Sequence, residues 1–449
     1  MNGNRIHIRL IILLAFLWLS ALMSFLLLPD RDHMADVMYV RTSSLWRAPA
    51  GMFLKETKIQ TRTLPLVRLE VEEEDLFSMR NGIYIQGYSG LLSWREGNVW
   101  DQPANYQERG RYSERGASVE IFSQSGKTAF SCNTRIRIHG NRTRSFPQKS
   151  IRIEKKKNNS FAGKELERFN GYSAFILRNG GNSWGRDLIT DVLVHKLCTG
   201  LNVDHLEYVP VTVQINGEYW GIHFLTGRIN ESFLAKKHGV KKKQVEFLEW
   251  EKDVNAEKRL QFRKEWLALS KLPADSVAFR KLDEFLDIEN FIDYVCTELY
   301  MGNKDWPANN VKMYKIRDGR WKWILHDMDF SLGYANEENA SAFDGFAALK
   351  KSKTMMNILF TDLIKFKKFR IMFKSRMLFL MNHWWNNENV QSEIEALCST
   401  LRPEIPLHCL RWRKPVSVSE WKEHVNYRRE FLKTRRAFIE KQLVLHLSE

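Results

Sequence analysis

Strand patterns and helix patterns occupy different halves of this 449-residue sequence. In the first half, short runs that alternate polar and apolar residues are separated by Gly, Asn and Pro, as in residues 134–140 (TRIRIHG) and 149–154 (KSIRIE). Such alternation is typical of strands with one buried face. After about residue 230 the apolar residues recur at helical spacing, as in residues 287–300 (DIENFIDYVCTELY). This order predicts an α+β fold with two lobes, the first rich in sheet and the second helical.

Turn signals add detail to this prediction. Residues 64–77, 81–90 and 117–122 are predicted as strands and turns, and residues 185–201 as the one helix of a mostly antiparallel first half. Asn216-Gly217 separates two strand patterns and is the strongest short-range signal for a hairpin. A second hairpin, over residues 317–319 (RDG), interrupts the helical half. A strand-rich half followed by a helical half is the layout of a two-lobed, kinase-like phosphotransferase.

Residues 10–28 contain no charged side chain and follow Arg5 and Arg9. A run of this length approaches the roughly 20 residues that a membrane-spanning helix needs, and the positive flank favours the cytoplasm. We therefore expect a cytoplasmic flank at 1–9, an uncleaved transmembrane signal anchor at 10–28 and a juxtamembrane linker at 29–60. The sheet-rich lobe is then expected at 61–229 and the helical lobe at 230–449. The main domain would be extracytoplasmic in a single-pass membrane protein, although basic residues within 31–41 leave the inverted topology open.

Composition excludes a disordered chain, since 44% of the residues are hydrophobic. The formal net charge of +16 favours acidic partners, but no nucleic-acid-binding module accompanies it, so we expect no nucleic-acid partner. The five cysteines include no CxxC pair, which argues against a cysteine metal site. A Cys398–Cys409 disulfide and buried free thiols both stay open.

Phosphoryl transfer needs a carboxylate near the acceptor hydroxyl, an amide and a carboxylate that hold metal against the phosphates, and a cation on the phosphates. Within the turn-rich segment 302–310 (GNKDWPANN), Asp305 precedes Asn310 by five residues. The catalytic-loop aspartate and the metal-binding asparagine of protein kinases have the same spacing. Asp305 is thus a candidate catalytic residue and Asn310 a candidate metal ligand. An aspartate that caps a turn is the ordinary alternative.

Two further carboxylates follow the second hairpin, at Asp327 and Asp329. In a strand, side chains two residues apart share a face, so these two could converge on Mg²⁺. Lys149 begins a predicted strand just after a loop that holds Gly140, Arg142 and Arg144, and is the candidate phosphate-contacting cation. A solvated strand end and a surface lysine are the ordinary alternatives for these residues.

The order of these motifs resembles that of the CotH kinase family, the spore-coat-protein-H-like atypical protein kinases. The resemblance runs from about residue 64 to about residue 333 and rests on segments 82–87, 135–153, 175–188, 209–225, 290–315 and 320–333. It implies a divergent kinase fold that uses ATP and Mg²⁺ or Mn²⁺ to phosphorylate Ser or Thr on proteins, often extracytoplasmic or coat proteins.

Carried over by position, the resemblance implies that Asp305 is the catalytic-loop aspartate and Asn310 its metal-binding partner. It also implies that Asp329, with Asp327 beside it, is the metal aspartate, and that Lys149 contacts the phosphates.

The same resemblance implies that the loop from Gly140 to Ser145 covers the phosphates, with Arg144 as a contact. Two departures from the family stand out. Family members commonly carry Asn-Asp where this chain has Asn182-Ser183, and Glu where it has Gly227. Asp191, on the predicted helix, is a candidate nucleotide-site residue and acidic partner for Lys149.

Two functions follow. The first is a membrane-anchored kinase that transfers the γ-phosphate of ATP to envelope or coat proteins. The second is a catalytically weak or dead pseudokinase that serves as a surface binding or scaffold module, which the two missing carboxylates favour. A glycosidase is disfavoured, because Asp327 and Asp329 are too close in sequence for the carboxylate separation which that chemistry requires.

Overall fold

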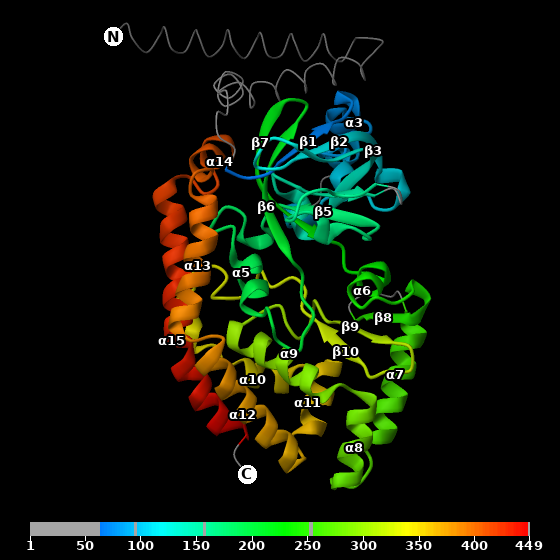
Figure 1. The fold of residues 1–449 in the computed structure, drawn as a ribbon, viewed down its shortest axis with the longest axis vertical. Helices are drawn as coiled ribbons and strands as arrows, with labels where there is room; N and C mark the ends of the chain where they lie inside the picture. The colour runs from blue at the N-terminus through cyan, green and yellow to red at the C-terminus, as the bar shows by residue number, and fades with distance from the viewer. Residues whose placement is uncertain (1–62, 94–96, 156–158, 251–254, 448–449) are drawn as a thin grey trace, which may run out of the picture. The chain divides into compact units, whose positions relative to one another are not determined.

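The computed structural model of the chain describes residues 63–93, 97–155, 159–250 and 255–447. Their elements follow the predicted order, strands first and helices second (Figure 1). The described parts of Val71–Arg115 form one compact unit, and those of Ile59–Glu70 and Gly116–Glu449 form another. The α+β prediction, with a sheet-rich amino-terminal part and a helical carboxy-terminal part, is confirmed.

Seven strands of the larger unit close into a barrel, in the order β1-β2-β3-β4-β5-β7-β6. All described pairings are antiparallel except that of β1 with β6, which closes the barrel. Alternating residues of these strands fill the interior, as the sequence pattern predicts. The strands are β1 (Leu66–Glu70), β2 (Arg115–Phe122), β3 (Thr128–His139), β4 (Ser150–Glu154), β5 (Ala174–Arg178), β6 (Tyr208–Ile215) and β7 (Glu218–Gly227).

The predicted hairpins are present. β6 and β7 are joined through Asn216 and Gly217, whose φ angles of 50° and 77° are both left-handed, as a type I′ turn requires. β3 and β4 pair antiparallel across the loop that contains the 3₁₀ turn η4 (Arg142–Ser145). The hairpin over residues 317–319 joins β9 (Lys312–Ile316) to β10 (Lys322–Ile324). With β8 (Val245–Glu249) they form a second sheet, in the order β10-β9-β8.

In the smaller unit, residues 82–86 lie within a stretch predicted as strands and turns. This stretch is a turn that leads into helix α4 (Gly87–Leu92). Ile83 N and Tyr84 N donate to the carbonyls of Asp75 and Leu76, so the segment bonds to helix α3 instead of a sheet. The apolar alternation there reflects burial in a turn. The remaining elements of the unit are α3 (Glu73–Phe77) and the 3₁₀ turns η1 (Val99–Asp101), η2 (Asn105–Gln107) and η3 (Arg111–Ser113).

Helix α9 (Ile288–Met301) lies at the centre of the helical half, because every residue except Glu289 is buried. Asp287 caps its first turn and Gly302, with a φ of 64°, ends it, so its end is fixed just before the segment that contains Asp305. Helix α15 (Val418–Leu447) runs beside α13 (Asn387–Leu401) in Figure 1. Its buried stripe includes two arginines, Arg428 and Arg435.

The other described helices complete the core around α9. All five cysteines are buried and free, so Cys398 and Cys409 form no disulfide. The helices are α5 (Thr190–Leu197), α6 (Glu231–Lys237), α7 (Ala256–Leu269), α8 (Ser276–Phe285), α10 (Gly345–Lys351), α11 (Met355–Leu363), α12 (Lys367–His383) and α14 (Ile405–Trp412), with 3₁₀ turns η5 (Glu167–Phe169), η6 (Gly181–Ser183), η7 (Lys242–Gln244) and η8 (Ala340–Ala342).

The predicted transmembrane segment 10–28 and linker 29–60 lie outside the described residues. Within the part of the chain that the structure describes, no helix combines the length and the apolar character needed to cross a membrane.

Candidate functional site

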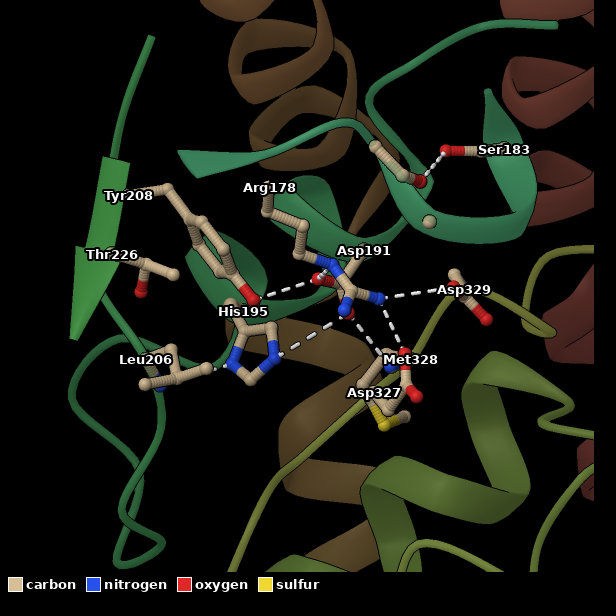
Figure 2. Close-up of polar contacts among 12 residues, drawn as sticks. Arg178, Ser183, Asp191, His195, Leu206, Tyr208, Thr226, Asp327, Met328 and Asp329 are labelled. Carbon is tan, nitrogen blue, oxygen red and sulfur yellow. Dashed lines mark hydrogen bonds and ion pairs between the residues drawn. The ribbon is translucent and has the colours of Figure 1, made fainter. Parts of the chain in front are cut away.

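Three parts of the larger unit bring charged side chains together. Arg178 is the last residue of β5, Asp191 lies in the first turn of α5, and Asp327 and Asp329 follow β10. Figure 2 shows the Arg178 guanidinium at the centre, with the three carboxylates around it. The side chains of Asp191 and Asp329 are buried, and those of Arg178 and Asp327 are partly exposed. Strand, helix and loop therefore converge on one partly open polar site.

Arg178 binds all three carboxylates. Its Nε lies 3.0 Å from Asp191 Oδ2. Its Nη2 lies 2.9 Å from Asp329 Oδ2 and also pairs with Asp327 Oδ1. Because both aspartates of the 327–329 segment reach the same nitrogen atom, their oxygens converge on one point, which is a cationic side chain and not the predicted metal ion. The reason given by the sequence for such convergence was wrong: β10 ends at Ile324, and Asp327 has a left-handed φ of 58°.

Asp191 is fixed by two further hydrogen bonds and also lies near His195, whose Nε2 makes no hydrogen bond. Tyr208 OH donates to Oδ2 over 2.7 Å and Met328 N donates to Oδ1 over 2.7 Å. His195 Nδ1 accepts a hydrogen bond from Leu206 N, so a neutral ring carries its proton on Nε2, which lies 3.7 Å from Asp191 Oδ1. Burial lowers the pKa of His195 to about 4, so this ring is neutral at pH 7. Asp191 is therefore a rigid anchor between β6, α5 and the loop after β10 (Figure 2).

Asp329 is held from its other side by η6. Asn182 N donates to Oδ2 over 2.8 Å and Asn182 Nδ2 donates to Oδ1 over 3.0 Å. Gly181 allows this approach, because a Cβ atom there would lie 2.0 Å from Asp329 Oδ2. Ser183, at one of the two family departures, is buried and donates from Oγ to the carbonyl of Gly180. Ser183 therefore stabilises the turn, and the hydrogen bonds to Asp329 come from its neighbour, Asn182.

The two neighbouring aspartates have opposite pKa shifts. Burial and the negative charge of Asp327 raise the pKa of Asp329 well above its usual range. Burial also acts to raise the pKa of Asp327, but the charge and hydrogen bond of Arg178, together with a hydrogen bond from Asp329 and the charge of Lys312, lower that pKa overall. A second cation between the two carboxylates would favour the ionised form of both. Carboxylate oxygens are the ligands that Mg²⁺ prefers, and it commonly takes one or two of them together with phosphate oxygens.

The structure brings Asp305 and Asn310 together. Asn310 Nδ2 donates to Asp305 Oδ2 and Asn309 Nδ2 donates to Oδ1, each over 2.7 Å. Asn310 has a left-handed φ of 63°, which turns its side chain back toward Asp305. The described hydrogen bond of the Asn310 amide is thus to Asp305. No described contact joins Asn310 to Asp327 or Asp329. Among the described residues there is also no group of three or more His, Cys, Asp or Glu side chains placed to hold a metal ion.

Backbone hydrogen bonds fix the Asp305 segment beside the Asp329 segment. Lys304 N donates to the carbonyl of Phe330, and Leu332 N donates to that of Met301. Asn303 links the loop to α9, because its Oδ1 accepts from Asp305 N and its Nδ2 donates to Glu298 Oε2 over 2.9 Å. The sequence order therefore becomes spatial proximity of the two predicted acidic motifs.

Lys149 is buried, and it is placed differently from the prediction. Its Nζ donates to the carbonyls of Arg144 and Phe146, over 2.6 and 2.9 Å. Burial lowers its pKa to about 7, and the charge of Arg144 acts in the same direction. Arg144 Nε in turn donates to the carbonyl of Gly140. These contacts hold the predicted covering loop, whereas the described contacts of Asp191 are those to Arg178, Tyr208, His195 and Met328.

Positive charge gathers beside the carboxylates. Burial lowers the pKa of His139 well below its usual range, and the charges of Arg178, Arg144, Arg228 and Lys312 act in the same direction. His139 ends β3, next to the covering loop. Several cations from different elements therefore act on one place, an arrangement suited to an anion.

The family described as CotH kinase protein matches residues 136–439. This chain belongs to the CotH kinase family. A search of curated proteins found no match to it. Membership suggests a kinase-like phosphotransferase and implies the use of ATP in general. The match reaches well past residue 333, where the sequence motifs end, and includes most of α15.

The second departure from CotH kinases is also explained by packing. Gly227 ends β7, and a Cβ atom there would lie 2.9 Å from Tyr172 Cε2 and 3.0 Å from the ring of Phe233. These two rings are 4.9 Å apart and fill the space of a larger side chain. Only glycine therefore fits at position 227 without a shift of its neighbours. The rings of Tyr172 and Phe233 occupy the space that a glutamate side chain would take.

Sequence reasoning missed Arg178, Asn182 and Tyr208. For Arg178 a signal was present, since an arginine at the end of the apolar run 174–177 and directly before Asn179-Gly180-Gly181 is unusual for a barrel strand. Tyr208 and Asn182 carry no local signal, because only the folded chain brings them to Asp191 and Asp329.

Proposed function

We propose that this CotH family member is an active kinase that transfers the γ-phosphoryl group of ATP to Ser or Thr hydroxyls of protein substrates. The observation that carries the proposal is the convergence of Asp327 and Asp329 on one atom, beside the loop in which Asp305 binds Asn310. Phosphoryl transfer is mostly a matter of positioning and charge, and these two groups supply the carboxylates it needs.

In this proposal Asp305 orients the acceptor hydroxyl and accepts its proton. Its carboxylate is presented by Asn309 and Asn310, and Asn303 anchors its backbone. Asp327 and Asp329 would hold Mg²⁺ or Mn²⁺, with Asn310 as a third ligand. When bound, the metal would neutralise charge on the phosphates of ATP. The donor types fit, because carboxylate and amide oxygens are ligands that Mg²⁺ takes.

The covering loop completes the nucleotide site in this proposal. Gly140 and Arg144 would lie over the phosphates, and Lys149 keeps the loop in shape through its two carbonyl contacts. Asp191 would act on the nucleotide through Arg178, with which it is paired.

The location and partners of the protein belong to the same proposal. Residues 10–28 would anchor the chain in a membrane, with the kinase domain outside the cytoplasm, and the substrates would be envelope or coat proteins. No nucleic-acid partner is expected.

A pseudokinase that serves as a binding or scaffold module is the second candidate. One specific observation favours it: Arg178 already neutralises the two aspartates that a metal would need. The missing carboxylates at Ser183 and Gly227 point the same way.

Transfer from labelled ATP by the full-length protein, purified in mild detergent with Mg²⁺ or Mn²⁺, tests the proposal. The proposal predicts label on the protein or on an added protein substrate, and its loss in Asp305→Asn and Asp329→Asn. Asp318→Asn is a matched control, because Asp318 is exposed in the turn between β9 and β10. Absence of label in the wild type, with no nucleotide-dependent rise in melting temperature, would leave the pseudokinase.

A further inference from the structure

Arg178 has one edge that the described contacts leave open. Its ion pairs use Nε, toward Asp191, and Nη2, toward Asp327 and Asp329. Nη1 takes part in no hydrogen bond described for this residue and is not among the buried polar atoms without a partner. The side chain as a whole is 15% exposed. Nη1 is therefore the guanidinium nitrogen with no described contact, and its two N–H groups can donate to a ligand.

The geometry also fixes where that open edge lies. Asp191 Oδ2 lies 3.0 Å from Nε in an ion pair that is not a hydrogen bond, and Tyr208 OH and Met328 N donate hydrogen bonds to Asp191 in turn. Figure 2 shows this chain of contacts ending on the guanidinium, next to the 327–329 segment. A guanidinium held at one edge loses little conformational freedom when its other edge binds an anion.

Lys149 differs from Arg178 in its exposure and in its hydrogen-bond partners. Its side chain is 3% exposed, and both described hydrogen bonds of Nζ go to main-chain carbonyls of the covering loop. An ammonium group has three N–H donors, so these carbonyls account for two of them. Contact with a phosphate would have to be made by a residue that is 3% exposed and whose Nζ already binds the covering loop. The side chain of Arg178 is more exposed, at 15%.

We propose that Arg178, anchored by Asp191, and not Lys149, makes the principal cationic contact with the phosphates of the bound nucleotide. This rests on the proposed kinase function, since it names a residue for its nucleotide. Arg178 would bind a phosphate oxygen through Nη1 while Nη2 keeps the two aspartates in register. Arginine suits this role, because its planar fork can hold a carboxylate and a phosphate at once. Lys149 is then a positioning residue for the covering loop.

A series of ligands with increasing phosphate content tests the assignment. Isothermal titration of the full-length protein at saturating Mg²⁺ would give affinities for adenosine, ADP and the β,γ-imido analogue of ATP. For Arg178→Met we expect affinity for the two phosphate-bearing ligands to fall about 10- to 100-fold, the range for a lost charged hydrogen bond. Affinity for adenosine should change less than about threefold. For Lys149→Met we expect the gain in affinity with each added phosphate to stay close to the gain measured for the wild type.

Two further variants guard against a trivial loss of folding. Arg178→Lys keeps a positive charge without the fork, so it should lie between wild type and Arg178→Met. Arg178→Met combined with Asp191→Asn removes one positive and one negative charge, and should show the same selective loss for phosphate-bearing ligands. Unchanged adenosine binding in each variant shows that the site is folded.

The possible outcomes distinguish a failure of the Arg178 assignment from a failure of the kinase function. A selective loss in the Arg178 variants and retention in Lys149→Met supports the assignment. A selective loss in Lys149→Met that equals or exceeds that of Arg178→Met overturns it, while leaving the kinase function intact. A wild-type protein that binds none of the three ligands overturns the kinase function, and the assignment with it.

Discussion

Arg428 of α15 forms a buried ion pair with Asp187, which lies three residues before α5, with 2.8 Å between Nε and Oδ2. The other nitrogens of Arg428 donate to the carbonyls of residues 332–334. Asp187 Oδ1 accepts from Ile189 N and Thr190 N at the start of α5. One ion pair therefore joins the last helix to the helix that carries Asp191 and to the chain that follows Asp329.

Replacing Arg428 by Met should lower the free energy of unfolding by about 3–5 kcal/mol, because it leaves Asp187 buried without its charged partner and removes a donor from three carbonyls, of which that of Gly333 keeps Asn336 N. Arg436→Met is the matched control on the same helix. Arg436 pairs with Glu440 at the surface, so its loss should cost less than about 1 kcal/mol. Urea unfolding followed by circular dichroism measures both values. Equal, small losses in the two variants would contradict the structural role of Arg428.

Replacing Gly181 by Ala should abolish most nucleotide-dependent phosphate transfer. Gly181 has a φ of 61°, and a Cβ atom would lie 2.0 Å from Asp329 Oδ2 and 2.6 Å from Arg178 Nη2. The carboxylate must move, and a shift of about 1 Å in a positioned group can lower a rate about 100-fold. Gly217→Ala is the control, since it has a similar φ of 77° but nothing within 4 Å of its Cβ.

Transfer from labelled ATP and the melting temperature should be measured for both glycine variants. Gly217→Ala should lose about 1 kcal/mol of stability from its backbone strain and keep its transfer rate. If Gly181→Ala transfers phosphate as fast as Gly217→Ala, the close packing of η6 against Asp329 does not matter for catalysis.

Replacing Gly227 by Glu, the residue that the family resemblance leads us to expect there, should damage this chain instead of improving it. The new side chain would press on Tyr172 and Phe233, and overpacking of this kind costs about 1–3 kcal/mol. Gly116→Glu is the control, because Gly116 is exposed near the start of β2 with open space around its Cβ. Thermal unfolding compares the two. A Gly227→Glu protein that is as stable as wild type and more active would show that the missing carboxylate is a true loss.

The parts of the fold that the sequence predicted are those with local causes. The β6–β7 hairpin follows from Asn216-Gly217, whose left-handed backbone needs no tertiary contact. The Asp305–Asn310 contact spans five residues, and the turn between them closes it. In contrast, residues 82–86 alternate like a strand but bond to α3, and no local feature distinguishes these two outcomes.

The centre of the site has no local cause. Arg178 precedes Asp327 in the sequence by 149 residues and Asp329 by 151. Their contact depends on the register of the barrel, on the path of the second sheet and on a left-handed residue at 327. The same is true of Arg428, which is 241 residues from Asp187. The acidic residues of the site were predicted from their spacing in the sequence. Arg178 and Arg428 were not predicted, because their partners are determined only by the tertiary fold.

The stability of the protein should depend on pH through Glu298, which supports the Asp305 loop through Asn303. Burial raises the pKa of this carboxyl from 4.5 to about 8. The folded protein thus holds a proton that the unfolded chain has lost, so the stabilisation is complete below pH 4.5 and is lost as the pH rises to 8. Relative to Glu298→Gln, which does not titrate, the wild type should lose about 1.4 kcal/mol per pH unit in that interval. Urea unfolding of both proteins from pH 5 to pH 9 measures the difference. Parallel curves would mean that Glu298 is ionised in the folded protein and that its burial is relieved by groups other than Asn303.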